Sequence, residues 1–421
     1  MADGFSSGFR RAKFLLAWNI LKFFPGGYRT PAKLAQRVLV VPPDPWDLTG
    51  SRGDEAMIQA VIDKFSAAMP HRLHLGIVVA TERAAAAARG LGVEPLLVWG
   101  AFMPTSRAIL KFNADAAVVI GADCMDGFYS PETSSRLVAT ADILARRGVP
   151  VAFTGFSFND KPSPFVVRAF NQLASAVQVN LRDPVSLGRF QRATRCPAHL
   201  VADVAFLLNP AVDSERLSTV KTWVAQQRAA GAPVIAFNVH PHLVKGGSPQ
   251  DLQALIGASS RALARVLAET QVSVLLLAHD YRERDGDGNC LGGIYEALRE
   301  SYGPRVLYPA GPYSASELKE IASLMDGVIT GRMHLAIASL GMGVPVSAFA
   351  YQGKFNGLLK HFNYPENMQI SAADALSEDK VHALITRFLQ SLAELTVVTQ
   401  TALPAVKKLS LNNLRAFLAP Q

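Results

Sequence analysis

At 421 residues the chain is too long for one ordinary domain, and it suits two domains of about 200 residues each. Hydrophobic residues make up 49% of it and charged residues 18%, so most of the chain is expected to fold around buried cores. The net charge of +8 suits anionic partners. No zinc-finger spacing, RNP-like aromatic signature or long basic run is present, which argues against nucleic acid.

The cysteines indicate a reducing compartment. Cys124, Cys196 and Cys290 lie far apart and form no C-x-x-C pair. The sequence therefore predicts neither a disulfide framework nor a zinc site, and it favours a cytoplasmic location.

Residues 1–30 are expected to form a separate basic and apolar helix. Asn19 and Lys22 interrupt its apolar stretch, which is too short to span a bilayer. One helical face would carry Phe14, Trp18, Leu21 and Phe24, beside Arg10, Arg11 and Lys13. This pattern suits peripheral contact with the inner face of an anionic membrane. The alternative is that the same face packs on the helix's own domain.

Short apolar runs and helical stretches then alternate along the chain. The strand-like runs are 38–41, 75–80, 95–99, 116–121, 150–154 and 177–181. The helical stretches between them include 55–67, 82–89, 134–147 and 165–174. This alternation is typical of an α/β domain with a parallel sheet.

A second series of the same kind follows. Its strands are expected at 233–237, 272–278, 305–308, 327–330 and 344–349, and its helices at 251–269, 291–301, 314–324 and from Met333 onward. The sequence thus predicts two Rossmann-like domains that face across a cleft, an architecture called GT-B. We place the N-terminal domain at 31–210, on the acceptor side, and the C-terminal domain at 211–382, on the donor side. Residues 383–421 would add helices near 383–392 and 404–418 that pack near the junction.

Nucleotide-binding fingerprints are missing. Neither half carries G-x-G-x-x-G after its first strand, and no G-x-x-x-x-G-K-[ST] occurs. The run Gly286-Asp-Gly288 belongs to a charged loop that begins at Arg282, which we interpret as a surface excursion.

The run from Asp326 to His334 predicts an anion site. Residues 327–330 read as a buried strand, Gly331 as a turn and Met333 as the start of a helix. Arg332 and His334 would then lie at a helix N-terminus, where free N–H groups favour an anion. Lys354 follows the next strand and would open onto the same sheet edge. The alternative is that Arg332 pairs with a carboxylate such as Asp326, His334 caps the helix and Lys354 is solvated.

Arg182 also follows a strand-like run, at 177–181, and is a second candidate for anion binding. Asp183 and Pro184 after it predict the N-cap and first residue of a helix. In the alternative, Arg182 only neutralises Asp183 or Asp203.

Four carboxylates are candidates for binding the hydroxyl groups of an acceptor. They are Asp54 and Glu55, which open a helix, and Asp123 and Asp126, which follow a strand. Asp54 and Glu55 could instead serve the helix dipole alone. His240 and His242 follow one strand at the i, i+2 spacing of a metal-binding pair, and His279 follows another strand. The sequence does not indicate a third ligand for such a pair, so no metal is predicted.

Three motifs resemble the polysaccharide pyruvyl transferases. The run DGVITGRMHLAIASLGMGVPVSAFAYQGKFNG, which begins at Asp326, is similar to their signature, in which an R-[LM]-H and a Y-x-x-K element are separated in this way. Gly53-Asp-Glu-Ala56 is similar to the family's G-D-E-A element, and Asn180-Leu-Arg-Asp183 to its central R-D element. One departure is Gly121-Ala-Asp-Cys, where the family commonly has G-G-G.

The resemblance implies a GT-B-like fold and transfer of pyruvate from phosphoenolpyruvate to sugar hydroxyls as a ketal. The acceptor would be a surface polysaccharide or its lipid-linked oligosaccharide precursor. Arg182, His334 and Lys354 would be the donor-binding and catalytic residues, with Arg332 beside them. Phosphoenolpyruvate would be a co-substrate, and no cofactor or metal is implied. Because histidine transfers protons near neutrality, His334 is our candidate general acid.

Two other functions remain open at this stage. One is a GT-B glycosyltransferase, whose nucleotide-sugar diphosphate would occupy the same cations. The other is a non-catalytic member of a polysaccharide assembly complex that keeps only the fold. The presence of Arg182, His334 and Lys354 together argues against the second.

Overall fold

The computed structural model describes residues 2–23, 37–71, 73–244, 248–283, 286–350 and 353–418. The side chains of residues 2–9 and of Lys354 lie outside this description, as does Phe24. The chain forms two compact units. The first contains Met1–Thr49, Met57–Val204 and Leu409–Gln421, and the second contains Gly50–Ala56 and Ala205–Lys408. The units are therefore not the contiguous ranges 31–210 and 211–382, because a short N-terminal segment joins the second unit.

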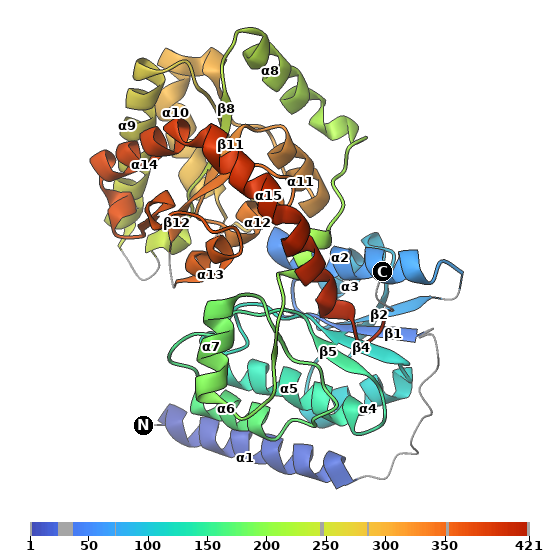
Figure 1. The fold of residues 1–421 in the computed structure, drawn as a ribbon. Helices are drawn as coiled ribbons and strands as arrows, with labels where there is room; N and C mark the ends of the chain where they lie inside the picture. Colours follow the sequence, from blue (N-terminus) through green and yellow to red (C-terminus); the bar gives the residue numbers. More distant parts are fainter. Residues whose placement is uncertain are drawn as a thin grey trace. The chain divides into compact units, whose positions relative to one another are not determined.

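The first unit is built on a five-stranded parallel sheet in the order β3-β2-β1-β4-β5 (Figure 1). Its strands are β1 (Arg37–Val41), β2 (His74–Val79), β3 (Glu94–Leu97), β4 (Ala116–Val119) and β5 (Val151–Phe153). Every residue of β4 and β5 is buried, as expected for strands covered on both faces. The run 177–181 yields only β6 (Asn180–Leu181), which pairs with β7 (His199–Leu200) outside this sheet.

Helices connect these strands. They are α2 (Arg52–Ala68), α3 (Glu82–Gly90), α4 (Phe102–Phe112), α5 (Pro131–Ala145), α6 (Pro164–Asn171) and α7 (Pro184–Ala193). The predicted start of α7 is confirmed, because the Asp183 carboxylate accepts a hydrogen bond from Ser186 N at 2.7 Å.

The second unit repeats this architecture with a six-stranded parallel sheet in the order β10-β9-β8-β11-β12-β13. Its strands are β8 (Val234–Asn238), β9 (Ser273–Leu276), β10 (Val306–Leu307), β11 (Gly327–Thr330), β12 (Val346–Ala350) and β13 (Gln369–Ser371). Its helices are α8 (Ser218–Ala229), α9 (Pro249–Glu269), α10 (Gly288–Tyr302), α11 (Ala315–Ser323), α12 (Met333–Leu340) and α13 (Lys354–Lys360). Both units are therefore α/β and Rossmann-like, as predicted.

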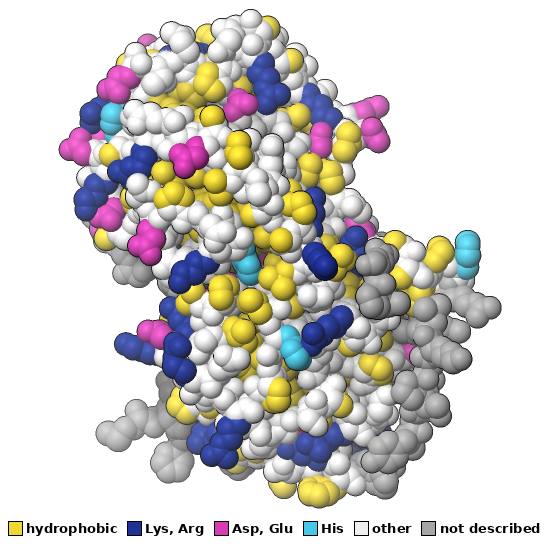
Figure 2. All heavy atoms as spheres, viewed as in Figure 1, with side chains coloured by type: hydrophobic (Ala, Val, Ile, Leu, Met, Phe, Trp, Pro, Cys, Tyr) yellow, Lys and Arg dark blue, Asp and Glu magenta, His cyan; other side chains and the backbone are white. Residues whose placement is uncertain are grey.

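The C-terminal helices differ from their predicted ranges. They are α14 (Glu378–Gln390) and α15 (Leu392–Leu411), and Pro404 lies inside α15 instead of starting a helix. Arg261 and Arg265 of α9 pair with Glu378 at 2.7 Å and Asp379 at 2.9 Å. Figure 2 shows acidic and basic side chains interspersed over this side of the second unit. Exposed pairs of this kind contribute little stability.

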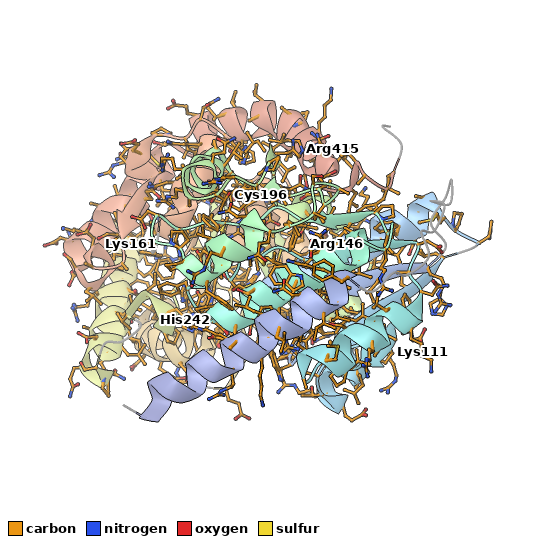
Figure 3. The ribbon with its side chains drawn as sticks, turned by 90° about the horizontal axis from the view of Figure 1, so that it is seen from below. Lys111, Arg146, Lys161, Cys196, His242 and Arg415 are labelled. Carbon is orange, nitrogen blue, oxygen red and sulfur yellow. The ribbon has the colours of Figure 1, made fainter. Side chains whose placement is uncertain are left out.

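The N-terminal helix α1 (Ala2–Phe23) packs on the first unit, which was the alternative to membrane contact for its aromatic face. Trp18 is fully buried and Leu21 nearly so. The Phe14 ring lies 4.8 Å from that of Phe102 and 6.0 Å from that of Phe165, centroid to centroid. Figure 3 shows α1 crossing this face of the first unit. These residues therefore belong to the protein core.

No single helix among the described residues is long and apolar enough to cross a membrane. Helices α14 and α15 pass that test only as a pair bent by 69°.

Candidate functional site

The candidate site of the second unit lies at the carboxyl ends of β8 and β11, two adjacent strands at which the strand order reverses. Open α/β sheets bind ligands at such a point. Asn238 ends β8 and Thr330 ends β11, and the Thr330 hydroxyl donates to Asn238 Oδ1 at 3.0 Å. The same hydroxyl accepts a hydrogen bond from Arg332 N at 2.9 Å. The turn that leads into α12 is therefore fixed to the neighbouring strand.

Arg332 is buried and paired with two carboxylates. Its Nε donates to Asp287 Oδ1 at 2.8 Å, and its guanidinium lies 3.3 Å from Asp280 Oδ2. Asp326, the partner considered from the sequence, instead lies 3.4 Å from Arg228. A buried arginine with this many charge-assisted bonds fixes the backbone around it.

The loop that contains Asp287 was interpreted as an exposed surface loop, and this is wrong for Asp287. Its side chain is fully buried. Besides Arg332, the carboxylate accepts hydrogen bonds from Asn238 Nδ2 at 2.7 Å and from the backbone N–H groups of His279 at 2.8 Å and Asp280 at 3.2 Å. The charged sequence indicated exposure, but the buried Arg332 requires a buried counter-charge.

His334 occupies the first turn of α12, as the sequence predicts, and packs on the start of α2. A Cβ atom at Gly53 would overlap its imidazole ring and lie 2.7 Å from Cγ. Only glycine lets the ring approach this backbone so closely. Because Gly50–Ala56 belongs to the second unit, the G-D-E-A and R-M-H elements meet inside one unit.

Glu55 connects the starts of α2 and α11. It is buried, and its Oε1 accepts a hydrogen bond from Ala315 N at 2.8 Å, at the N-terminus of α11. Its other oxygen pairs with Arg52. The Arg52 guanidinium also lies 5.3 Å from the centroid of the Tyr281 ring. Glu55, which lies in the first turn of α2, therefore also serves the N-terminus of α11.

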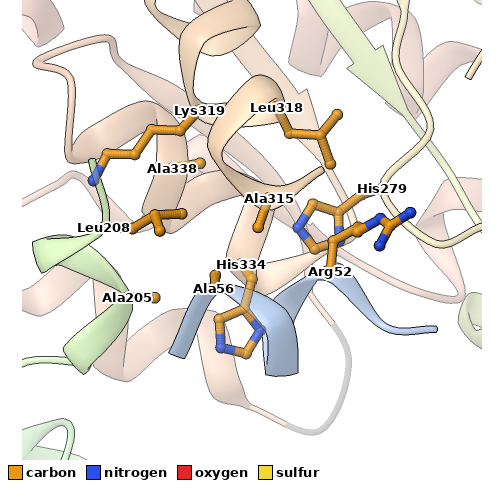
Figure 4. A pocket seen from close by; sticks show the side chains of 10 residues that line it. All are labelled: Arg52, Ala56, Ala205, Leu208, His279, Ala315, Leu318, Lys319, His334 and Ala338. Carbon is orange, nitrogen blue, oxygen red and sulfur yellow. The ribbon is translucent and has the colours of Figure 1, made fainter. Parts of the chain in front are cut away.

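A small pocket lies beside His334, and all of its lining residues belong to the second unit. They are Arg52, Ala56, Ala205, Leu208, His279, Ala315, Leu318, Lys319, His334 and Ala338. Figure 4 shows Arg52 and His279 together on one side and Lys319 and Leu208 on the other. The buried Lys319 ammonium donates to the Phe206 carbonyl at 3.0 Å. Sequence reasoning did not single out Arg52, whose motif was considered for its carboxylates, or Lys319, which lies within a helix.

The two buried histidines of this region favour their neutral forms. Burial lowers the pKa of His279 well below its ordinary value, and the neighbouring His334 and Arg332 lower it further. Burial and Arg332 likewise lower the pKa of His240. A neutral His279 adds no positive charge to the pocket, which is also lined by the basic side chains of Arg52 and Lys319.

The second unit also contains Asp54 and Lys354. Asp54 is half-buried in the first turn of α2. Lys354 begins α13 after Gly353, whose φ of 67° lies in the left-handed region. The Lys354 side chain is outside the described residues, so its expected role stays a prediction.

The remaining candidates belong to the first unit, where Arg182 is buried and hydrogen-bonded. Its Nε donates to Ser157 Oγ at 2.8 Å and its NH1 to Asp203 Oδ2 at 3.0 Å. Asp203 is one of the two carboxylates that the sequence offered as its partner. The pairing positions Arg182 firmly, and its donor-binding role stays a prediction.

Asp126 and Asp123 lie in the loop that follows β4. Asp126 is buried and accepts hydrogen bonds from Phe128 N at 2.8 Å and Asn159 N at 3.1 Å. It therefore stabilises the loop. Asp123 is half-buried, 3.4 Å from the Tyr129 hydroxyl. Gly121 is the one glycine that this chain keeps where the family commonly has G-G-G. A Cβ atom at Gly121 would overlap the Thr154 carbonyl oxygen, so packing requires a glycine here.

The described residues include no group of three or more His, Cys, Asp and Glu side chains placed to hold a metal ion.

A family model described as polysaccharide pyruvyl transferase matches residues 19–353, and this match ends one residue before Lys354. The comparison with curated proteins gives no match.

Among solved structures, a UDP-GlcNAc 2-epimerase from Neisseria meningitidis is 12% identical with a TM-score of 0.56, and the alignment covers 91% of this chain and 100% of that one. A glycosyltransferase from Rickettsia africae is 13% identical with a TM-score of 0.53, with 92% and 96% covered. At these identities the likeness concerns the fold alone, and it confirms the predicted GT-B type.

Proposed function

Because the chain belongs to the polysaccharide pyruvyl transferase family, we propose that it transfers the pyruvate unit of phosphoenolpyruvate to sugar hydroxyls as a ketal. The acceptor would be a surface polysaccharide or its lipid-linked oligosaccharide precursor. The reaction would take place in the cytoplasm, on the inner side of the membrane.

The observation that carries this proposal is the packing of His334 on Gly53, beside Arg52 and His279. It joins two of the three motifs of the resemblance around one protonatable group. A histidine held against backbone in this way has a fixed ring orientation, which proton transfer requires.

The donor would be held by cations and by a helix N-terminus. Phosphoenolpyruvate carries a carboxylate and a phosphate, and each favours arginine or lysine. In this proposal Arg52 and Lys354 are donor-binding residues of the second unit, and the first turn of α12 adds backbone N–H groups. The donor-binding role of Arg182, in the first unit, stays a prediction. Arg332 was expected to bind the donor directly. Its bonds to Asp287 and Asp280 favour a positioning role, in which it fixes the turn that carries His334.

The reaction would proceed in two additions at the same carbon. His334 would protonate the methylene carbon of phosphoenolpyruvate while a first sugar hydroxyl adds to the adjacent carbon and gives its proton to a carboxylate such as Asp54, which leaves that carbon bonded to two oxygens. The bond to the phosphate oxygen would then break, and phosphate would leave with its electron pair. A second hydroxyl of the sugar would add to the same carbon and lose its proton, which closes the ketal.

The acceptor hydroxyls need a hydrogen-bond acceptor. Asp54 and Asp123, both half-buried, remain our candidates. Glu55 and Asp126 were also expected here, but the hydrogen bonds that they accept from Ala315, Phe128 and Asn159 favour structural roles.

Thermal unfolding in the presence of donor candidates tests this function. A ligand at a hundred times its Kd stabilises the folded protein by about 2.7 kcal/mol. We expect phosphoenolpyruvate to raise the melting temperature of the wild type and of His334→Gln, and to have less effect on Arg52→Ala. If UDP-GlcNAc raises it and phosphoenolpyruvate does not, the proposal is wrong and the nucleotide-sugar alternative is favoured.

A further inference from the structure

The outward face of α1 carries large apolar side chains that are exposed to solvent. Leu16 is 63% exposed, Ile20 42% and Phe23 84%. Their spacing of four and then three residues places them on one side of the helix. We call these three residues the α1 stripe. Single exposed apolar residues are ordinary, but an aligned set along one helix marks an interaction surface.

The opposite face of α1 holds the helix on the first unit. The Trp18 indole donates to the buried Asp142 carboxylate at 2.9 Å, and Lys22 Nζ donates to Gln172 Oε1 at 3.0 Å. Arg11 pairs with Glu132 at 2.7 Å. The stripe is therefore presented by a docked helix that lies along the outside of this unit (Figures 1 and 3). This geometry suits a broad surface better than a groove.

The charge around the stripe identifies its partner. Between Arg10 and Phe23 the chain has four basic and no acidic residues. Arg10 and Lys13 are exposed one to two turns before Leu16. An apolar face flanked by cations suits an interface of acyl chains and anionic headgroups. A second copy of this chain is disfavoured, because a twofold contact would place the cations of both copies, and no acidic residue of this stretch, in one interface.

We propose that α1 docks the protein on an anionic lipid bilayer through Leu16, Ile20 and Phe23, with Arg10 and Lys13 at the headgroups. The contacting face is opposite to the one that the sequence indicated. Docking through α1 is independent of the donor and of the reaction.

Co-sedimentation with vesicles tests the docking. We expect binding to vesicles of phosphatidylglycerol and phosphatidylcholine, and little binding to phosphatidylcholine alone. Replacing the stripe in Leu16→Ser/Ile20→Ser/Phe23→Ser should lower the partition coefficient at least about tenfold. Val212→Ser, which changes a 53% exposed valine of the second unit, should have no effect. Arg10→Gln and Lys13→Gln should each lower binding about fivefold on the anionic vesicles only.

Several results would overturn the proposal. One is a triple variant that binds vesicles as the wild type does, and another is equal binding to neutral and anionic vesicles. A third is a wild-type dimer that binds no vesicles and that the triple variant dissociates, which would assign the stripe to a second copy. The melting temperature of the triple variant should match the wild type, since the stripe is exposed. If the triple variant does not fold, Arg10→Gln and Lys13→Gln decide the question.

Discussion

Gly53 is the residue that most directly positions the candidate acid. A side chain at this position would displace the His334 ring, and a displacement of about 1 Å can lower catalysis about 100-fold. We therefore expect Gly53→Ala to lower kcat/KM for phosphoenolpyruvate by about that factor. The matched control is Gly292→Ala within α10, where a Cβ meets nothing within 4 Å. Gly292→Ala should keep full turnover. Full turnover in Gly53→Ala would show that catalysis does not need the close packing of His334 on Gly53.

The buried histidines His240 and His279 make stability depend on pH. Both folded-state pKa values are depressed, so below about pH 6.5 the unfolded chain binds protons that the folded chain does not. The contribution of the neutral histidines to the free energy of unfolding is complete above that pH. It is lost as the pH falls, by about 1.4 kcal/mol per pH unit for each histidine. The pKa of Asp280 is also lowered, so this carboxylate makes stability depend on pH only in a more acidic range, below its ordinary pKa of 3.8.

Urea unfolding at pH 7.5 and pH 5.5 measures this effect. We expect a lower midpoint at pH 5.5, and a smaller difference between the two in His279→Gln. His71→Gln, at an exposed position, should behave as the wild type. A midpoint that is the same at both pH values would show that the histidines are not held neutral.

Among the elements, α2 and α11 are joined by Glu55. We expect Glu55→Gln to lower the free energy of unfolding by about 1–3 kcal/mol, because a charge-assisted bond to a helix N-terminus becomes a neutral one. Glu366→Gln, at an exposed position of the same unit, should change it by less than about 0.5 kcal/mol. Chemical denaturation checks both. Unchanged stability with lost turnover would instead make Glu55 an acceptor-binding residue.

Strands and helices with strong apolar patterns were predictable, and contacts between distant segments were not. β11 has the predicted bounds, since Gly327–Thr330 is a buried run between clear turns. The contact of His334 with Gly53 joins residues far apart in the chain, and no local pattern encodes it. The Asp287 loop was misjudged because its charges resemble a solvated surface, whereas their partner Arg332 is buried. Likewise, the spacing of apolar residues in α1 indicated a face that is buried, but it did not specify whether the protein or a membrane covers that face.

At the scale of the whole molecule, the fold alone does not decide the chemistry. The two Rossmann-like units are shared with an epimerase and a glycosyltransferase at 12% and 13% identity, so the GT-B type leaves the donor open. The family match and the packing of His334 on Gly53 carry the proposed function. The central claim is that His334 transfers a proton to phosphoenolpyruvate.

Phosphate release from phosphoenolpyruvate, measured against a panel of lipid-linked and nucleotide-linked sugars, tests that claim most directly. We expect the wild type to release phosphate only when a suitable acceptor is present. His334→Gln should lower the rate by about 10²–10⁴-fold while phosphoenolpyruvate still binds, and His71→Gln should not change it. Wild-type rates in His334→Gln, or sugar transfer from a nucleotide sugar without phosphate release, would contradict the account.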